Sequence, residues 1–417
     1  MVNKDILKKR AEKYLDGITS EIYEIGETLM NMPELGYKEF KTSEFVYKSL
    51  RDLNINTEKG IAITGVLSVA EGRKHLANIC IMGELDAVIS PEHPNADRGS
   101  GAAHACGHNI QLANMLACAK TLKNSGVMEY LDGDVTFLAV PAEEFIDTEY
   151  RSSLKKEGKI TYLSGKQEMI NLGVFNNIDA AMMVHSQADC PERRLFIGGG
   201  GLGFTAKKIK FSGKEAHAGG APYDGINALN AASAALMMIG LQRETFRDED
   251  KIRVHSIITK GGDSVNTVPA DVRMELYVRG VSEDVIKDAE RKVDAAINGA
   301  AYGIGASAEI TTLGSYAPLI QNRELSRVFA DNAEGFADEI CFGVDMIGST
   351  DVGDLCRVIP AIQPTIGGFC GAAHSKDFHA EDKYFTHIVP AKIMINTVID
   401  LLYNNAEKIL EMRDKHG

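Results

Sequence analysis

The sequence lacks tryptophan, and aromatic residues make up only 7% of its 417 positions. It also lacks an excess of basic residues, because 45 Lys and Arg stand against 58 Asp and Glu and leave a net charge of −13. A surface that binds nucleic acid requires a basic field. We therefore expect no nucleic-acid partner, although acidity alone identifies no other partner.

Long apolar segments are missing as well. No run approaches the roughly 18 apolar residues of a membrane-spanning helix. Residues 1–10 lack the apolar core of a signal peptide. From these absences we expect no membrane partner and a cytoplasmic location.

The cysteines do not form a disulfide framework. There are seven of them, an odd number, and they are scattered without regular spacing. This pattern favours reduced thiols in the core or at a ligand site. Cys118 falls on the apolar face of a helix expected over 108–124, so we interpret it as a core residue.

The length of the chain predicts two domains, since single cores stop growing at roughly 250 to 300 residues. Residues 1–200 and 314–417 alternate helical and strand patterns, which predicts an α/β domain with a central sheet flanked by helices. Long helices are expected over 4–30 and 390–415. Residues 201–313 follow the order β-α-β-β-α-β of a ferredoxin-like α+β sheet, and we expect this insertion to be a lid or dimerisation module.

Polar side chains follow several of the expected strands. Glu84 and Asp86 follow the strand over 75–82, and in α/β sheets functional side chains gather at the carboxyl ends of strands. Without the motifs described next, Glu84 and Asp86 would be better interpreted as part of a turn rich in acidic residues. Residues 145–166 are polar and charged, and they are interpreted as an inserted loop or helix over the site.

Five side chains at the ends of expected strands or the starts of helices are candidate metal ligands. Imidazole and thiolate suit zinc, and carboxylate suits harder metals such as manganese, so a set of five fits two divalent ions. A lone histidine is more often a core or surface residue, which leaves His379 as a competing ligand and His104 as a cap or support. The five candidates are Cys106, His108, Glu144, His185 and His374.

Glu143 directly precedes the candidate ligand Glu144 and is the natural general base. A carboxylate beside a metal-activated water can take its proton and pass it to the leaving amine. The alternative is that one of the two glutamates only forms a salt bridge.

Three further candidates lie in the inserted segment. His217 could donate to a developing oxyanion, in the partner subunit's site if the chain dimerises, although alone it would be read as a turn histidine. Asn266 and Arg279 offer an amide and a guanidinium that could hold a substrate carboxylate. Arg279 is equally plausible as a surface residue.

At these residues the chain resembles the binuclear metallo-amidohydrolases and peptidases that include aminoacylases, hippurate hydrolases and indole-acetyl-amino-acid hydrolases. Residues 106–109 and 348–354 look most like the p-aminobenzoyl-glutamate hydrolase and β-alanyl-lysine dipeptidase branches. The motifs that carry the resemblance are Glu84-Leu85-Asp86-Ala87, His104-Ala105-Cys106-Gly107-His108, Pro141-Ala142-Glu143-Glu144 and His374-Ser375.

The resemblance implies two divalent metal ions per chain, zinc or manganese, and a homodimer formed by the lid domain. It implies the same five ligands, Glu143 as base, and contacts to substrate and transition state from His217, Asn266 and Arg279. The expected activity is hydrolysis of the amide bond of an N-acyl, possibly aryl-acyl, amino acid. A dipeptidase is the alternative within enzymes, and a non-catalytic binding relative is the alternative from another class.

Overall fold

The computed structural model describes residues 3–416 and divides into two compact units. The chain crosses back into the first unit after residue 319 rather than after 313, because strand β13 (Ser307–Tyr316) continues past the expected boundary. Unit 1 consists of Met1–Gly200, Ile320–Asp345 and Asp354–Gly417, and unit 2 consists of Gly201–Leu319 and Met346–Gly353.

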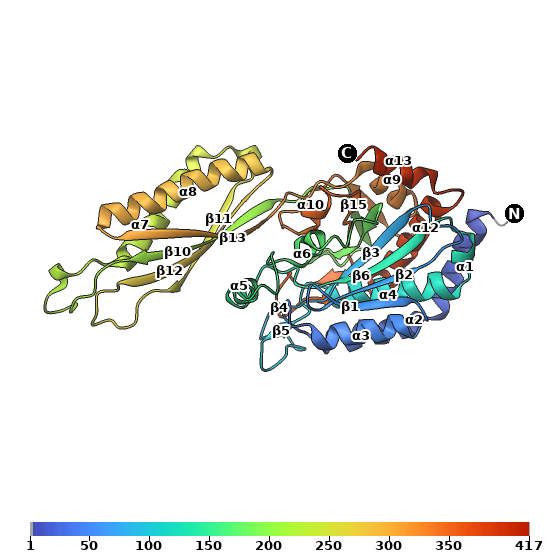
Figure 1. Ribbon diagram of the computed structural model, residues 1–417, viewed down its shortest axis with the longest axis horizontal. Coiled ribbons are helices and arrows are strands. Elements are labelled where there is room, and N and C mark those ends of the chain that lie inside the picture. The colour runs from blue at the N-terminus through green and yellow to red at the C-terminus, as the bar shows by residue number, and fades with distance from the viewer. Residues whose placement is uncertain (1–2, 417) are drawn as a thin grey trace. The chain divides into compact units, whose positions relative to one another are not determined.

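Within the described residues, unit 1 is built on a six-stranded sheet in the order β1-β2-β6-β3-β7-β15 (Figure 1). The strand β3 runs parallel to both β6 and β7, so these three strands end at the same edge. Strands β1 and β2 pair antiparallel on one side of this core. The bounds are β1 (Asn56–Ile61), β2 (Gly65–Ala70), β3 (Asn78–Glu84), β6 (Asp134–Val140), β7 (Ala180–Met182) and β15 (Ala361–Ile362).

Helices surround this sheet, and a smaller sheet in the order β14-β9-β16-β8 lies in the same unit. The helices are α1 (Lys4–Gly17), α2 (Thr19–Met30), α3 (Phe40–Arg51), α4 (His108–Asn124), α5 (Thr148–Lys156), α6 (Gly165–Asn171), α9 (Arg323–Asp331), α11 (Lys383–His387), α12 (Val389–Leu402) and α13 (Glu407–Asp414), with α10 (Val352–Leu355) at the boundary between the units. The short strands are β4 (Val88–Ile89), β5 (Ala102–Ala103), β8 (His185–Ser186), β9 (Arg194–Ile197), β14 (Glu339–Phe342), β16 (Thr365–Ile366), β17 (Phe369–Cys370) and β18 (His379–Ala380).

Two helices expected to be continuous are broken. The first is interrupted at Ile18, whose φ of −110° and ψ of 12° are not helical. The last is interrupted where Asn404, Asn405 and Ala406 adopt positive φ angles, which cannot continue a right-handed helix. Gly17 directly precedes the first break and two asparagines form the second, but the apolar periodicity continues across both and did not reveal them.

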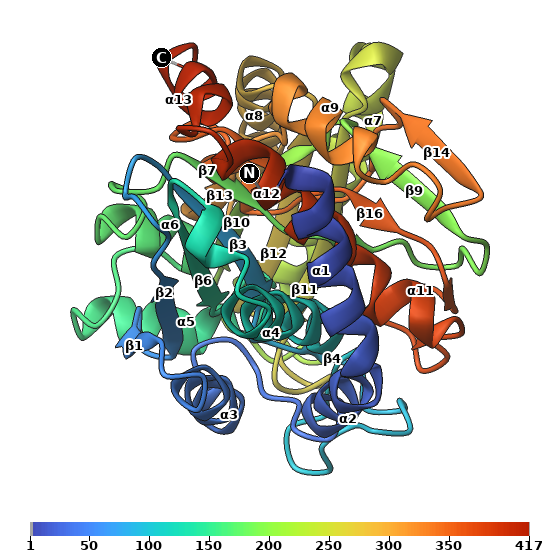
Figure 2. The same cartoon turned by 90° about the vertical axis from the view of Figure 1, so that its right-hand side faces the viewer.

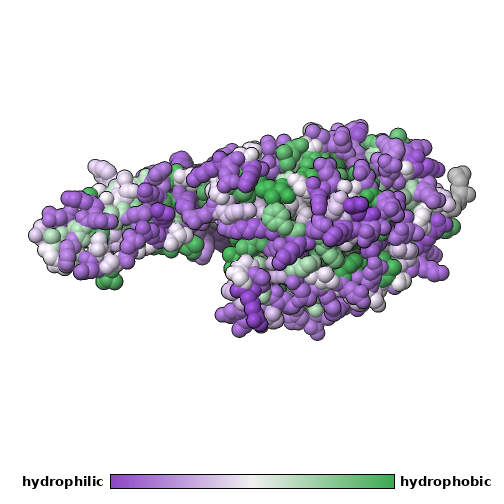
Figure 3. Space-filling view, turned by 60° about the horizontal axis from the view of Figure 1, so that its bottom comes forward, coloured by the Kyte–Doolittle hydropathy of each residue, from purple (hydrophilic) through white to green (hydrophobic). Residues whose placement is uncertain are grey.

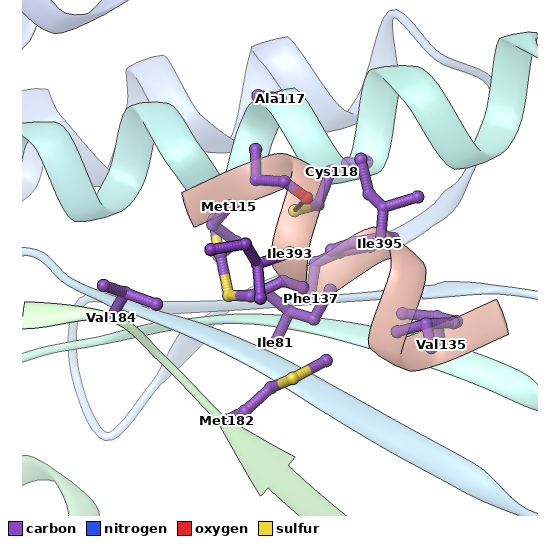
Figure 4. Packing of buried hydrophobic residues seen from close by; sticks show 14 of the residues in the cluster. Ile81, Met115, Ala117, Cys118, Val135, Phe137, Met182, Val184, Ile393 and Ile395 are labelled. Carbon is purple, nitrogen blue, oxygen red and sulfur yellow. Dashed lines mark hydrogen bonds between the residues drawn. The ribbon is translucent and has the colours of Figure 1, made fainter. Parts of the chain in front are cut away.

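Helix α4 forms the centre of the unit 1 core. It is buried on nearly every face, and it packs on the sheet and against α1, α2 and α12 (Figure 2). Figure 4 shows Met115 and Cys118 of this helix in the same cluster as Ile81 of β3 and Phe137 of β6. Cys118 is fully buried, which confirms its interpretation as core. The helix is therefore rigidly held, and its first residue, His108, is held with it.

One helical stretch within residues 3–416 corrects the expectation about apolar runs. Lys383–Leu402, with a mean hydropathy of 1.3, has the length and composition of a membrane-spanning helix. The structure buries 94% of its apolar window, as in the core helix of a folded domain. The molecular face in Figure 3 is mostly hydrophilic, with scattered apolar residues.

All seven cysteines are free thiols.

Unit 2 has the expected ferredoxin-like order. In the described chain its four-stranded antiparallel sheet has the order β11-β12-β10-β13, and α7 packs against α8 over a shared apolar core. The buried positions of β12 alternate strictly, as expected for a sheet with one covered face. The remaining bounds are β10 (Gly203–Ser212), α7 (Ala228–Leu241), β11 (Arg253–Lys260), β12 (Asp271–Gly280) and α8 (Glu283–Ile304).

Candidate metal centre

The carboxyl edge of the parallel strands carries the candidate site. Glu84 is the last residue of β3, and Glu143 and Glu144 follow the end of β6 by a few residues. His185 begins the short strand β8 shortly after β7. The arrangement brings side chains that are up to about a hundred positions apart in sequence to one edge, as expected from the parallel order.

The motif around Gly107 presents two donors from the start of α4. Gly107 caps the helix with a φ of 85°, a left-handed conformation that favours glycine. A Cβ at this position would also lie 3.1 Å from the Ser186 side chain. This close approach places Cys106 and His108 on either side of the cap, next to the strand that carries His185.

The structure brings all five candidate ligands together in two groups of donor atoms. One group contains Cys106, His108 and His185, and the other contains Cys106, Glu144 and His374. Within each group, all donor atoms lie within 4.8 Å of one another. The Cys106 thiol is common to both groups, so the arrangement suits two neighbouring cations that share one thiolate.

Hydrogen bonds orient the buried His108 and the half-buried His185 for this purpose. The Nδ1 atoms of His108 and His185 lie 2.8 and 2.9 Å from the backbone carbonyls of Asp86 and Ser186. Because a carbonyl only accepts, each Nδ1 must carry the proton, and each Nε2 is left as the ligand atom.

The distances between donors fit divalent cations. Two ligands of a tetrahedral zinc ion lie about 3.3 to 3.6 Å apart, given the usual metal–ligand bond lengths. Cys106 Sγ is 3.5 Å from His185 Nε2, and Glu144 Oε1 is 3.3 Å from His374 Nε2. Glu144 Oε1 is buried and makes no hydrogen bond to any residue in 3–416. The donor set and this unsatisfied oxygen therefore fit a two-metal site.

Electrostatics keep the donors in their ligating forms. Burial and the charge of Glu144 raise the pKa of Cys106, but His185 and His108 outweigh them and lower it to about 6. The neighbouring Cys106 and Glu144 raise the pKa of His374 to about 11. Burial opposes the charged form of His108, yet the Glu84 carboxylate holds its pKa well above the usual range. When no metal cation is bound, the protonated histidine rings thus offset the negative charge of the buried anions.

A strained turn presents the two glutamates. Ala142 has a φ of 54°, which is uncommon for a residue with a side chain. Its N–H donates to the buried Glu39 carboxylate at 2.8 Å, and its carbonyl accepts from Arg151 at 3.2 Å. Because Glu39 and Arg151 hold the N–H and the carbonyl of Ala142, the turn keeps Glu143 and Glu144 at the site.

The segment 145–166 contains helix α5 and the start of α6, which agrees with the helix alternative, and two of its basic side chains are buried at the site. Arg151 of α5 is fully buried against the Ala142 turn, and Lys166 of α6 is fully buried and donates to Glu84 Oε1 at 2.5 Å. Sequence reasoning missed both residues, because they lie in a charged stretch without periodicity. The presence of Glu84 and Asp86 after β3 was the one signal that pointed to this network.

Other candidates lie outside the two groups. His379 belongs to a separate, exposed group with Cys370 and Glu381 on the β17–β18 hairpin. His104 is buried, and burial lowers its pKa to about 3, so the ring is neutral. Asn109, on α4 just after the motif, donates to the Gly26 carbonyl in the core.

In unit 2 the structure brings His217 and Asn266 side by side. The Ala218 N–H donates to the Asn266 carbonyl, and His217 forms a bridge with Thr267. His217 Nδ1 accepts from the backbone N–H groups of Gly219 and Gly220. With Nδ1 as acceptor, the ring carries a proton on Nε2, and the exposed side chain can offer this N–H as a donor.

Arg279 lies at the other end of the unit 2 sheet. It follows Asp271 by eight residues on β12, which is roughly 26 Å at the usual rise per strand residue. Asn266 lies beyond Asp271 on the opposite side. The guanidinium donates to Ser349 and packs over Phe204. One small substrate cannot contact both ends of unit 2 in a single chain.

Comparison with known proteins identifies the family. The sequence profile of peptidase family M20/M25/M40 matches residues 80–402, more than half of the chain. The chain belongs to this peptidase family. The resemblance and the hydrolase class expected from the sequence are thereby confirmed.

Relatives with curated names support the same class. Thermostable carboxypeptidase 2 of Saccharolobus solfataricus is 29% identical over 315 residues, which cover 72% of this chain and 74% of the relative. The N-acetyl-L-cysteine deacetylase of Bacillus subtilis is 24% identical over 99% of this chain and 94% of its own length. This chain is therefore a metal-dependent hydrolase of amide or peptide bonds.

Solved structures confirm the fold expected for both domains. An M20 peptidase of Bacillus subtilis described as binding a dinuclear metal matches with a TM-score of 0.69 and 21% identity, covering 93% of this chain and 99% of its own. The aminobenzoyl-glutamate utilization protein of Klebsiella pneumoniae matches with a TM-score of 0.70 and 17% identity, covering 94% and 98%. At these identities the likeness supports the fold alone.

The lowered pKa of Cys106 predicts a thiolate in the metal-free protein near neutral pH. The folded pKa of about 6 lies below the ordinary 9.0, so the thiolate and the stability it contributes are lost as the pH falls through about 6. We expect the ultraviolet thiolate absorbance of metal-stripped protein to fall with this midpoint. Subtracting the absorbance of the Cys106→Ser variant removes the contribution of the other cysteines. A midpoint of the absorbance change near the ordinary thiol pKa would contradict the assignment.

Proposed function

We propose that the chain hydrolyses the amide bond of N-acyl amino acids with two divalent metal ions. The observation that carries the proposal is the pair of donor groups that share Cys106. In the proposed assignment, Cys106, His108 and His185 hold one ion, and Cys106, Glu144 and His374 hold the other. Zinc or manganese fits this mixture of thiolate, imidazole and carboxylate donors.

When bound, such ions polarise the substrate carbonyl and lower the pKa of the attacking water. Glu143 takes the proton of that water and returns it to the leaving nitrogen, for which its buried position in the same cluster as Glu84 and His108 is suitable. His217 Nε2 donates to the oxyanion that develops on the carbonyl oxygen. Asn266 and Arg279 bind polar groups of the substrate.

Relatives support a small substrate that carries an amino-acid moiety. They include the N-acetyl-L-cysteine deacetylase of Bacillus subtilis, an IAA-amino acid hydrolase of Arabidopsis thaliana and the human Xaa-Arg dipeptidase. Two of these three names describe acyl-amino-acid amides, which supports that class as the proposed substrate. The second candidate, a dipeptidase, is supported by the third name.

We further propose a homodimer formed through unit 2. The two ends of its sheet are too far apart to contact one small substrate. In a dimer, each end of unit 2 could contact the substrate bound by a different chain. Strand β11 is an edge of the sheet and exposes Ile257 and Ile258, and α7 exposes Met237 and Leu241. Exposed apolar side chains beside an open strand edge favour association with another chain.

Replacing Glu143 by glutamine tests the proposed chemistry. The amide has the same shape but cannot accept the proton, so we expect kcat to fall by about 10²- to 10⁴-fold on a panel of N-acetyl, aryl-acyl and dipeptidyl amides. Release of the free amino acid measures the rate. The exposed Glu58→Gln serves as control. Undiminished turnover by folded, metal-loaded Glu143→Gln contradicts the role of the base, and cleavage of dipeptides alone favours the second candidate.

Mixing two inactive variants tests the shared site. His217→Ala and Glu143→Gln homodimers are each expected to be nearly inactive. If His217 of one chain serves the site of its partner, subunit exchange creates hybrid dimers with one intact site, and about a quarter of wild-type activity returns. If each chain supplies its own His217, every site in the hybrid keeps one defect, and no activity returns.

A further inference from the structure

We propose that Glu84 is a fourth protein donor to the ion held by Cys106, His108 and His185, and that the buried Lys166 holds it in place. This inference rests on the proposed two-metal function and assigns a role to two residues that the mechanism does not use. It makes the two metal positions chemically different.

The two oxygens of Glu84 have different surroundings. The side chain is fully buried, and its Oε1 accepts from Lys166 Nζ at 2.5 Å. Its Oε2 makes no hydrogen bond within residues 3–416, although it lies 3.1 Å from His108 Nε2. A buried carboxylate oxygen without a donor is uncommon in folded proteins and requires an explanation.

The ring of His108 supplies the explanation. In its metal-ligating form the ring is neutral and its Nδ1 carries the proton that is donated to the Asp86 carbonyl, so the lone pair of Nε2 faces Glu84 Oε2. His108 Nε2 is also without a hydrogen bond among the described residues. In that form the two lone pairs would repel unless a cation lay between them, whereas in the metal-free protein the protonated ring offsets the Glu84 charge.

The distance agrees with this arrangement. The separation of 3.1 Å between His108 Nε2 and Glu84 Oε2 is within a few tenths of an ångström of the 3.3 and 3.5 Å found between the other paired donors. Glu84 and His108 also form a group of possible ligands with Glu143. The carboxylate therefore lies where a further ligand would lie.

Lys166 explains why Glu84 can be buried at this position. Its ammonium fixes one carboxylate oxygen and offsets the charge, which leaves the other oxygen directed at His108. Four protein donors complete a tetrahedral zinc site, whereas the ion at Cys106, Glu144 and His374 has three and keeps an open position. The second ion is thus the one available to substrate.

Zinc titration of the metal-free protein tests the inference. For Glu84→Gln we expect the dissociation constant of one of two zinc ions to rise by about tenfold or more, with the other unchanged. The control Glu168→Gln alters a buried carboxylate of α6 that accepts from the N–H groups of Thr161 and Tyr162, and both affinities should stay as in wild type. Two unchanged affinities in Glu84→Gln overturn the inference. Fewer than two ions in wild type contradicts the proposed function instead.

Two further variants keep the test decisive if Glu84→Gln does not fold. The double variant Glu84→Leu with Lys166→Met removes both charges and leaves neither buried without its partner, and we expect the same loss at one zinc position. In Lys166→Met alone, Glu84 remains charged, so added zinc should raise the melting temperature more than it does in wild type.

The matched control for this comparison is Lys207→Met. Lys207 is a buried lysine of unit 2 that pairs with Asp294 at 2.7 Å, remote in sequence from every candidate ligand. Zinc should raise the melting temperature of Lys207→Met by the same amount as that of wild type. If Lys166→Met also responds like wild type, the Glu84–Lys166 pair is only a structural ion pair and the inference fails.

Discussion

The structure of unit 1 depends on the neutralisation of buried negative charge. Cys106, Glu144 and Glu84 converge below the surface, where an uncompensated anion would be too costly to keep. The chain supplies some positive charge itself, through Lys166 and the imidazolium rings. The remaining unsatisfied oxygen atoms point at positions where divalent cations fit, so the metal centre completes the electrostatics of the fold as well as supplying the chemistry.

Rigid elements hold this cluster in place. The parallel strands deliver the carboxylates, and the buried helix α4 fixes His108 through its packing on all sides. The backbone turn at Ala142 is held by Glu39 and Arg151, which lie outside the set of donors. The proposed chemistry therefore relies on residues distributed over most of unit 1, and small changes in their packing would alter donor distances.

The sequence predicted the five candidate ligands because each follows a recognisable strand or opens a helix. Periodicity also predicted the β-α-β-β-α-β order of unit 2. It could not predict that Arg151 and Lys166 are buried, since their burial arises from tertiary partners such as the Ala142 carbonyl and Glu84. Nor could it show that Arg279 and His217 lie at opposite ends of a sheet, because that separation depends on strand pairing.

The most direct test is elemental analysis of purified protein after reconstitution with zinc or manganese. Because Cys106 is the donor common to both groups, the account predicts close to two ions per chain in wild type and the loss of both in Cys106→Ala. Cys118→Ala, which removes a thiol from the core, should keep both ions if it folds. Wild-type protein that binds no metal, or Cys106→Ala that retains both ions, would contradict the two-metal centre.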